Sequence, residues 1–335
     1  MKKFVTITIL VVFAGALVFL LGPKPDPFNE NAEVSRDRLD GLLSINDIGT
    51  YLETQDEGKN IRDKNYSQLL WADSVGRKTK YVLLYLHGFS ASPMEGAPVH
   101  ENIALRYGMN MYVPRLAEHG LREEEPMLHF TGEKYIESAK EALQVARELG
   151  DTVIIMSTST GGTAALYLAS ADNDIHSLIC YSPNIRLFDS KAPLLSGPWG
   201  LQIARMVKGG NYHEWSLSSE ASKYWHTKYR LESLVELQNM IEGTMTKEVF
   251  SKVKAPTYIG YYFKDEANQD SAVSVDAILE MYEELGSAVK EKVVFPEAGN
   301  HCIPSGFLGE DIEGLYKSTC GFIENELKIL PVSKR

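Results

Sequence analysis

The sequence predicts an α/β protein in which helices cover both faces of a mostly parallel sheet. Two observations support this fold class: short apolar runs rich in Val, Ile and Leu recur along the chain, and segments with helical spacing of apolar residues lie between them. Strands that alternate with helices favour parallel pairing, because each helix carries the chain back to the start of the next strand. The 335 residues allow one large domain or two small ones.

The expected elements follow from local patterns. In the segment 133–149, Ile136, Ala139, Leu143 and Ala146 recur at steps of three and four residues, and Gly150 ends the helix. Strands are expected at 81–86, 152–156, 177–181, 257–263 and 291–295, and further helices at 161–170, 276–285 and 321–328.

A serine-centred turn joins the expected strand 152–156 to an alanine-rich helix. The turn reads Ser-Thr-Ser-Thr-Gly from Ser157 to Gly161. Such a strand–turn–helix lifts the central residue, Ser159, above the sheet, and small neighbours are needed because the two backbones nearly touch. The usual pattern begins with Gly, and this chain has Ser157 instead.

After the expected strand 81–86 the chain has a His-Gly turn, His87–Gly88. Candidate catalytic residues then follow in the order Ser, Asp, His, which is the chain order that one class of catalytic triad uses. His301 is expected to be the base, since of eight histidines it alone follows a late strand in a Gly-Asn-His turn. Asp265 and Asp270 both follow the expected strand 257–263. Asp265 is nearer the end of that strand, whereas Ser274, shortly after Asp270, can cap the next helix, so both aspartates stay candidates at this point.

These motifs resemble the α/β-hydrolase superfamily and, within it, the bacterial carboxylesterases and monoacylglycerol lipases. The resemblance spans roughly residues 81–323, and Glu118 departs from the family's usual glycine before the histidine. It is carried by His87–Ser90, Pro114–Gly120, Ser157–Gly162, Asp270–Val275 and Gly299–His301.

The resemblance implies a serine hydrolase that cleaves carboxylic esters through an acyl-enzyme. Ser159 would be the nucleophile, His301 the base and Asp270 the group that orients it. The backbone N–H groups of Phe89 and Thr160 would form the oxyanion hole. An amidase or aminopeptidase of the same fold, or a catalytically dead tethered binding protein, are the alternatives.

The segment from about 184 to 250 interrupts the alternation of strands and helices. It is expected to form a cap of helices and loops without a strand, whose aromatic and methionine side chains wall a pocket for an apolar acyl group. The side chains concerned are Trp199, Trp215, Trp225, Met206, Met240 and Met245. The expected ligand is therefore a small-molecule ester.

The amino-terminal residues predict a membrane anchor. Residues 4–21 carry no charge and follow Lys2 and Lys3, which favours a single-pass helix with the catalytic domain outside the cytoplasm. A cleaved signal peptide, with a secreted or periplasmic product, is the alternative. The expected organisation is an anchor at 1–22, a linker and peripheral segment at 23–65, and the hydrolase domain at 66–335.

Charge and cysteine content exclude other classes. A net charge of −11 argues against nucleic-acid binding, which needs clustered Lys and Arg. The three cysteines form neither a zinc pattern nor a disulfide framework, so no metal or other cofactor is expected. Cys180 is expected to be a buried thiol, and a Cys302–Cys320 bridge stays open.

Overall fold

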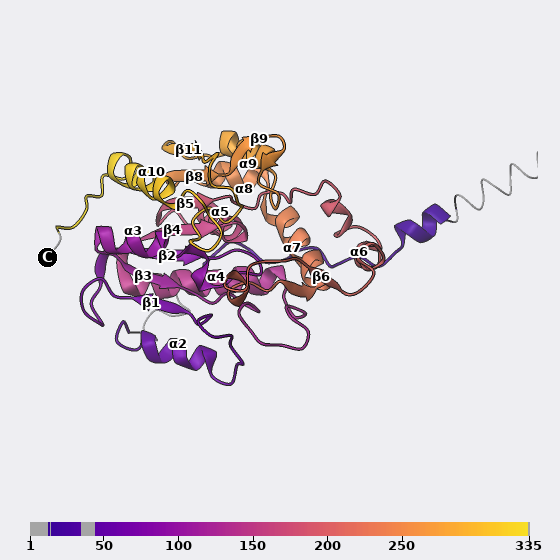
Figure 1. Ribbon diagram of the computed structural model, residues 1–335, viewed down its shortest axis with the longest axis horizontal. Helices are drawn as coiled ribbons and strands as arrows, with labels where there is room; N and C mark the ends of the chain where they lie inside the picture. The colour runs from indigo at the N-terminus through magenta and orange to yellow at the C-terminus, as the bar shows by residue number, and fades with distance from the viewer. Residues whose placement is uncertain (1–12, 14, 35–43, 334–335) are drawn as a thin grey trace, which may run out of the picture.

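A seven-stranded sheet forms the centre of the protein in the computed structural model, which describes residue 13 and residues 15–34 and 44–333. The strand order is β1-β3-β2-β4-β5-β8-β11, with only β1 antiparallel to its neighbour (Figure 1). The strands are β1 (Gln68–Leu70), β2 (Thr79–Leu86), β3 (Asn110–Val113), β4 (Gly150–Thr158), β5 (Ile175–Tyr181), β8 (Thr257–Tyr261) and β11 (Lys290–Val294). The predicted parallel sheet is confirmed.

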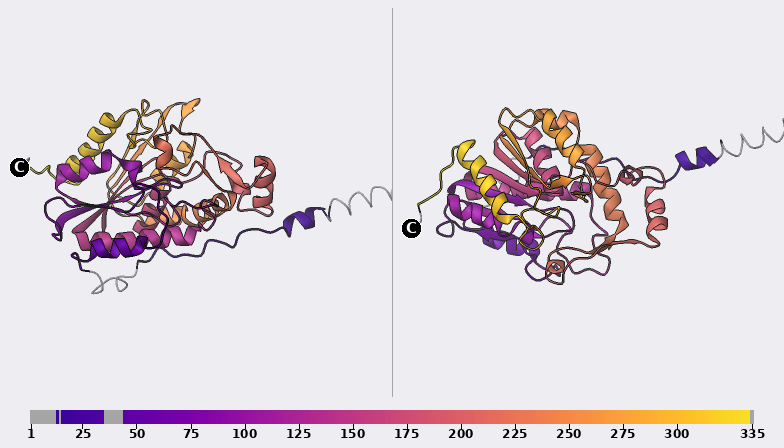
Figure 2. Two further views of the ribbon diagram at one scale, coloured as in Figure 1. Left: turned by 60° about the horizontal axis from the view of Figure 1, so that its bottom comes forward. Right: turned by 45° about the horizontal axis from the view of Figure 1, so that its top comes forward.

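Helices cover both faces of this sheet (Figures 1 and 2). On one face α4 and α5 pack against β2 and β4, and α8 and α9 follow beside α5; on the other face α3 and α10 lie together. Their bounds are α3 (Val99–Tyr107), α4 (Gly132–Leu149), α5 (Thr160–Ala171), α8 (Lys247–Lys252), α9 (Val275–Glu284) and α10 (Ile312–Asn325).

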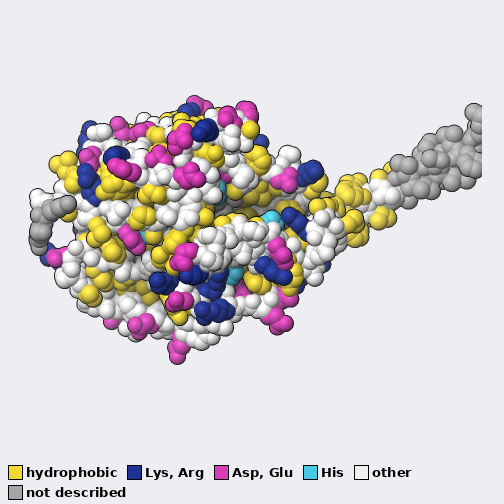
Figure 3. All heavy atoms as spheres, viewed as in Figure 1, with side chains coloured by type: hydrophobic (Ala, Val, Ile, Leu, Met, Phe, Trp, Pro, Cys, Tyr) yellow, Lys and Arg dark blue, Asp and Glu magenta, His cyan; other side chains and the backbone are white. Residues whose placement is uncertain are grey.

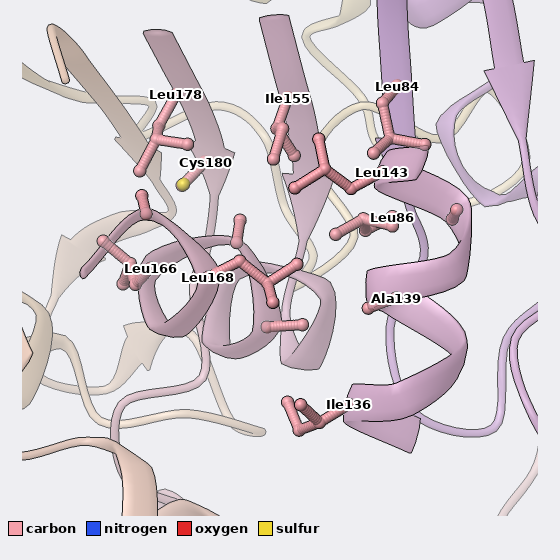
Figure 4. Packing of buried hydrophobic residues seen from close by; sticks show 14 of the residues in the cluster. Leu84, Leu86, Ile136, Ala139, Leu143, Ile155, Leu166, Leu168, Leu178 and Cys180 are labelled. Atoms are coloured by element: carbon pink, nitrogen blue, oxygen red, sulfur yellow. The ribbon is translucent and has the colours of Figure 1, made fainter. Parts of the chain in front are cut away.

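The period of two along β2 explains why both faces need a cover. Leu84 and Leu86 belong to the apolar cluster under α4 and α5, whereas Leu83 and Tyr85 belong to the cluster under α3 and α10. In Figure 4, Leu84 and Leu86 lie against Leu143 of α4. Each such side chain that is removed from water contributes about 1.5–3 kcal/mol to folding, so a bare face would be costly.

The chain between β5 and β8 contains α6 (Gly200–Lys208), a small sheet of β6 (Tyr212–Glu214) and β7 (Lys228–Arg230), and α7 (Leu231–Thr244). The helices agree with the expected character of this segment, which we call the cap. The expectation that it contains no strand is wrong, because β6 and β7 pair in antiparallel fashion. A second small pair, β9 (Phe263–Asp265) with β10 (Asn268–Gln269), follows β8.

Residues 23–34, which we call the strap, run along the body and the cap. The ammonium group of Lys140 on α4 lies 2.7 Å from the carboxylate of Glu30. The side-chain amide of Asn239 on α7 donates to the carbonyl of Asp26 at 2.7 Å. Phe28 packs against the apolar cluster under α4 and α5, which we call the main core. The strap therefore ties α7 to the body. Helix α2 (Ile48–Asp56) follows the strap along the chain, with Ile48 buried.

The predicted membrane anchor over residues 4–21, and with it a location at the cell membrane with the catalytic domain outside, is wrong. Among the described residues no helix has the length and apolar character needed to cross a membrane. Of the predicted span, residues 4–12 and 14 lie outside the described residues.

Candidate active site

Ser159 occupies the sharp turn between β4 and α5. Its backbone has φ 55° and ψ −122°, a conformation that side-chain-bearing residues rarely adopt and that is typically held in place at functional sites. A Cβ on Gly161 would lie 1.9 Å from the carbonyl oxygen of Leu86, and one on Gly162 would lie 2.7 Å from Cβ of Pro183. Small residues are therefore required after Ser159, as the sequence pattern predicts.

His301 and Asp270 contact each other directly. Nδ1 of His301 lies 2.6 Å from Oδ2 of Asp270. Asp270 has no exposed surface, and its second oxygen accepts the backbone N–H groups of Ala272 and Val273 at 2.9 and 3.0 Å. These bonds fix the carboxylate, which in turn fixes the imidazole ring.

The charge on His301 depends on opposing effects. Burial alone would lower its pKa, but the carboxylate of Asp270, with a smaller contribution from Glu95, outweighs burial and raises the pKa of His301 above its ordinary value. A neutral ring that donates from Nδ1 presents Nε2 as a proton acceptor. Ser159 and His301 line the same cavity.

Asp265 lies elsewhere. It is exposed at the end of β9, and its carboxylate accepts from the backbone N–H groups of Ala267 and Asn268 and from the side chain of Asn268. The amide of Asn268 lowers the pKa of Asp265. The structure thus brings Asp270 to His301 and leaves Asp265 in its own turn.

His87 holds the loop that carries Phe89. Its Nε2 accepts the backbone N–H of Leu116 at 3.2 Å, so Nδ1 carries the proton and donates to the carbonyl of Gly88 at 2.9 Å. Burial lowers the pKa of His87 well below its ordinary range, which keeps the ring neutral. Since a peptide unit is planar, fixing the Gly88 carbonyl also fixes the direction of the Phe89 N–H.

His119 supports the same loop one residue later. Its Nε2 accepts the backbone N–H of Ser90 at 3.0 Å, and its Nδ1 donates to the carbonyl of Ala117 at 2.7 Å. Burial lowers the pKa of His119 to about 4, so it too is neutral near pH 7. The second expected oxyanion donor, Thr160, is the first residue of α5, and its N–H has no acceptor inside that helix.

A cavity of about 700 Å³ opens between these loops and the cap. Figure 3 shows a hollow on this face of the molecule with apolar side chains along its walls. The body contributes Phe89, Ser159 and His301, while the cap contributes mostly aliphatic side chains. The aliphatic lining includes Leu187, Leu195, Ile203, Leu231, Leu234 and Leu237.

The expected aromatic wall is only partly right. Trp215 and Trp225 line the cavity, but Trp199 instead donates its indole N–H to the carbonyl of Val18. Met206 is 82% exposed and Met240 is fully buried in the main core. Leucine and isoleucine side chains of the cap provide most of the apolar surface, a role that the sequence alone does not distinguish from core packing.

The three cysteines are free thiols, so the Cys302–Cys320 bridge is not formed, and Cys180 is buried as expected. Among residues 13, 15–34 and 44–333, no group of three or more His, Cys, Asp or Glu side chains is arranged to hold a metal ion.

Sequence reasoning missed Glu95. This carboxyl group is 1% exposed, lines the same cavity and accepts the backbone N–H of Gly88 at 2.8 Å. A single glutamate between Met94 and Gly96 in a short turn carries no pattern that separates it from a surface residue.

No family model matches the chain. It is 31% identical to a thermostable monoacylglycerol lipase of Bacillus sp. (strain H-257) over 97 residues, which are 29% of this chain and 38% of that relative. The chain therefore matches well under half the length of this curated relative.

The overall structure is similar to many solved ones. A metagenome-derived lipolytic enzyme, from work on LipS and LipT, matches with a TM-score of 0.65 at 18% identity, over 80% of this chain and all of its own. A monoacylglycerol lipase of Paleococcus ferrophilus matches with a TM-score of 0.56 at 12% identity, over 77% of this chain and 97% of its own. Est1E of Butyrivibrio proteoclasticus matches with a TM-score of 0.52 at 14% identity, over 81% of this chain and all of its own. The chain has the α/β-hydrolase fold, and its resemblance to lipase-like serine hydrolases is confirmed.

Proposed function

We propose that this protein is a serine hydrolase that cleaves carboxylic esters with an apolar acyl group. The observation that carries the proposal is the 2.6 Å contact between Nδ1 of His301 and Oδ2 of Asp270, at a cavity that Ser159 also lines. The likeness to lipases and esterases supports ester hydrolysis in general.

The reaction takes two steps in this arrangement. Oγ of Ser159 attacks the ester carbonyl carbon while its proton passes to Nε2 of His301, and the alcohol then leaves with that proton. Water next attacks the acyl-enzyme, gives a proton to His301 and releases the carboxylic acid as Ser159 regains its own. The N–H groups of Phe89 and Thr160 stabilise the oxyanion in both steps.

The aliphatic lining of the cap supports an apolar acyl group as substrate. Lys191, Lys208 and Asp189 also line the cavity, so it has polar groups as well as an apolar wall. The domain organisation proposed with this function is a hydrolase body at 66–335, a cap at about 184–250 and a peripheral segment at 23–65.

The test is covalent labelling with a fluorophosphonate probe, together with hydrolysis of p-nitrophenyl esters of rising chain length. The wild-type protein should be labelled and should hydrolyse the esters, and Ser159→Ala should lose both. Ser170→Ala, which changes a serine near the far end of α5, is the matched control and should behave as wild type. Labelling that persists in Ser159→Ala would exclude Ser159 as the nucleophile.

A further inference from the structure

Glu95 is a second buried carboxyl group beside the proposed triad. It lies in the short 3-10 turn Pro93–Gly96 that follows the loop of Phe89, and Ser92 caps this turn by accepting the N–H of Met94. No ion pair with a Lys or Arg is recorded for it within the described part of the chain. A buried carboxyl group without a cation needs another reason to be there.

The contacts of Glu95 join separate parts of the site. One oxygen accepts the backbone N–H of Gly88 at 2.8 Å and the hydroxyl of Tyr85 at 3.2 Å. The other accepts the thiol of Cys302, the residue after His301, at 3.8 Å. Glu95 therefore links three parts of the site: the loop of Gly88 and Phe89, which we call the oxyanion loop, the end of β2, and the loop of His301 and Cys302, which we call the histidine loop.

The hydroxyl of Tyr85 extends this network to the serine turn. It also lies 2.8 Å from Oγ1 of Thr158, the residue before Ser159. A Cβ added to Gly88 would lie 2.9 Å from Cβ of Ser159 and 3.0 Å from Oε1 of Glu95. The nucleophile and the Glu95 carboxyl thus pack against the same glycine.

Gly88 is the point where this network reaches the chemistry. Its N–H is held by Glu95 and its carbonyl by His87, so the peptide units on both sides of its Cα are fixed. Glycine would otherwise have wide freedom in φ and ψ. The second of these units carries the N–H of Phe89, which is the donor proposed for the oxyanion hole.

We propose that Glu95 is a positioning residue for the proposed ester hydrolysis: it orients the Phe89 N–H through Gly88, and its negative charge acts on His301. The inference rests on the proposed function and adds to it a group outside the triad.

The titratable groups around Glu95 are consistent with this role. Burial raises the pKa of Glu95 to about 7, an effect that the N–H of Gly88 and the charge of His301 oppose. The negative charge of Glu95 in turn raises the pKa of His301, after the larger effects of burial and Asp270. The other titratable groups that face Glu95 are Tyr85 on β2, Tyr135 on α4 and Cys302.

The experiment compares Glu95→Ala and Glu95→Gln with wild type by kcat, KM and the titration of the His301 ring in NMR spectra. Glu95→Ala leaves the Gly88 N–H without its acceptor, so kcat should fall about 100-fold, as when an oxyanion donor is lost, with KM within about threefold. Glu95→Gln keeps an acceptor but removes the charge. Its kcat at alkaline pH should stay within about threefold, and the acidic limb of kcat/KM and the His301 titration should both move to lower pH by about half a unit.

Glu101→Gln is the matched control. Glu101 lies in the first turn of α3, and burial raises its pKa as well, but unlike Glu95 it is not hydrogen-bonded to the loop that carries Phe89. It should keep the wild-type profile.

Two results are separable. A wild-type protein that neither reacts with the fluorophosphonate nor hydrolyses esters overturns the proposed function, and the Glu95 role falls with it. A wild-type protein that is labelled, combined with an unchanged His301 titration in Glu95→Gln and an unchanged kcat in Glu95→Ala, overturns the Glu95 proposal alone. If Glu95→Ala does not fold, the His301 titration in Glu95→Gln decides.

Discussion

Two buried carboxyl groups lie near His301, and they differ in their hydrogen-bond donors rather than in their burial. Asp270 accepts two backbone N–H groups and Nδ1 of His301. Glu95 accepts one backbone N–H, a phenol and a distant thiol. Hydrogen bonds to the charged form favour a carboxylate, and desolvation opposes it. Both oxygens of Asp270 therefore have strong N–H donors, whereas burial raises the pKa of Glu95 to about 7, so that Glu95 gains or loses its charge near neutral pH.

The largest effect should come from the first of these groups. Asp270→Asn leaves the shape of the site but no longer holds the productive tautomer of His301, so kcat should fall by about 10⁴. Steady-state kinetics on a p-nitrophenyl ester measures this.

Asp265→Asn is the matched control, since Asp265 follows the same strand in an exposed turn, and its kcat should stay within about twofold. A large loss in Asp265→Asn with a small one in Asp270→Asn would show that the wrong carboxyl group has been assigned to His301.

The second effect is on stability and concerns Glu95. Its pKa is raised from 4.5 to about 7, so the protonated form is favoured in the folded state. This contribution is complete below the unfolded pKa and is lost as the pH rises through the folded one. The wild type therefore loses stability as the pH rises, whereas Glu95→Gln has no carboxyl group to titrate at this position. The free energy of unfolding of Glu95→Gln minus that of the wild type should increase by roughly 3 kcal/mol from acidic to mildly alkaline pH.

Urea unfolding of both proteins at several pH values measures this difference. The other titrating groups are common to the two chains and cancel in the comparison. Stability curves that stay parallel across the pH range would contradict the assignment of a titration near neutral pH to Glu95.

The smallest effect should come from a donor to Glu95. Tyr85→Phe removes the hydroxyl that bonds both Glu95 and Thr158, and it should cost about 1–2 kcal/mol in the free energy of unfolding and lower kcat by about threefold. Tyr258→Phe removes a hydroxyl that bonds Ser318 on α10, away from the site. Tyr258→Phe should lower the free energy of unfolding by a similar amount and leave kcat unchanged. An equal loss of kcat in both variants would mean that the Tyr85 hydroxyl has no special link to the site.

The sequence predicted the elements whose residues repeat a local pattern. The strand expected at 152–156 occurs as Gly150–Thr158, and the helix expected at 133–149 occurs as Gly132–Leu149. Both were predictable because a buried strand is a continuous apolar run and an amphipathic helix repeats apolar residues every three or four positions. The last helix begins at Ile312 rather than at residue 321. Its first turns carry Ile312, Leu315 and Tyr316 at helical spacing, and Asp311 before them accepts the N–H of Gly314 as a cap, so the signal for the earlier start was present in the sequence.

Features set by distant parts of the chain were not predictable in this way. β6 and β7 pair across a long loop without a hairpin turn, so no local pattern marks them. The anchor prediction relied on an uncharged apolar run that follows Lys2 and Lys3. The choice of Ser159, Asp270 and His301 came from turn context, but Glu95 becomes visible only when β2, the oxyanion loop and the histidine loop are brought together.

The strap has a consequence for how the protein is made. Asp26 is synthesised before its partner Asn239, from which it is separated by 213 positions in the sequence. At typical rates of synthesis, roughly 10 to 40 s pass before that partner exists. Pro23, Pro25 and Pro27 disfavour a helix in the strap before its partner has been made. The strap is thus synthesised well before its partner on α7, and its contact with the cap forms only after α7 (Leu231–Thr244) has been made.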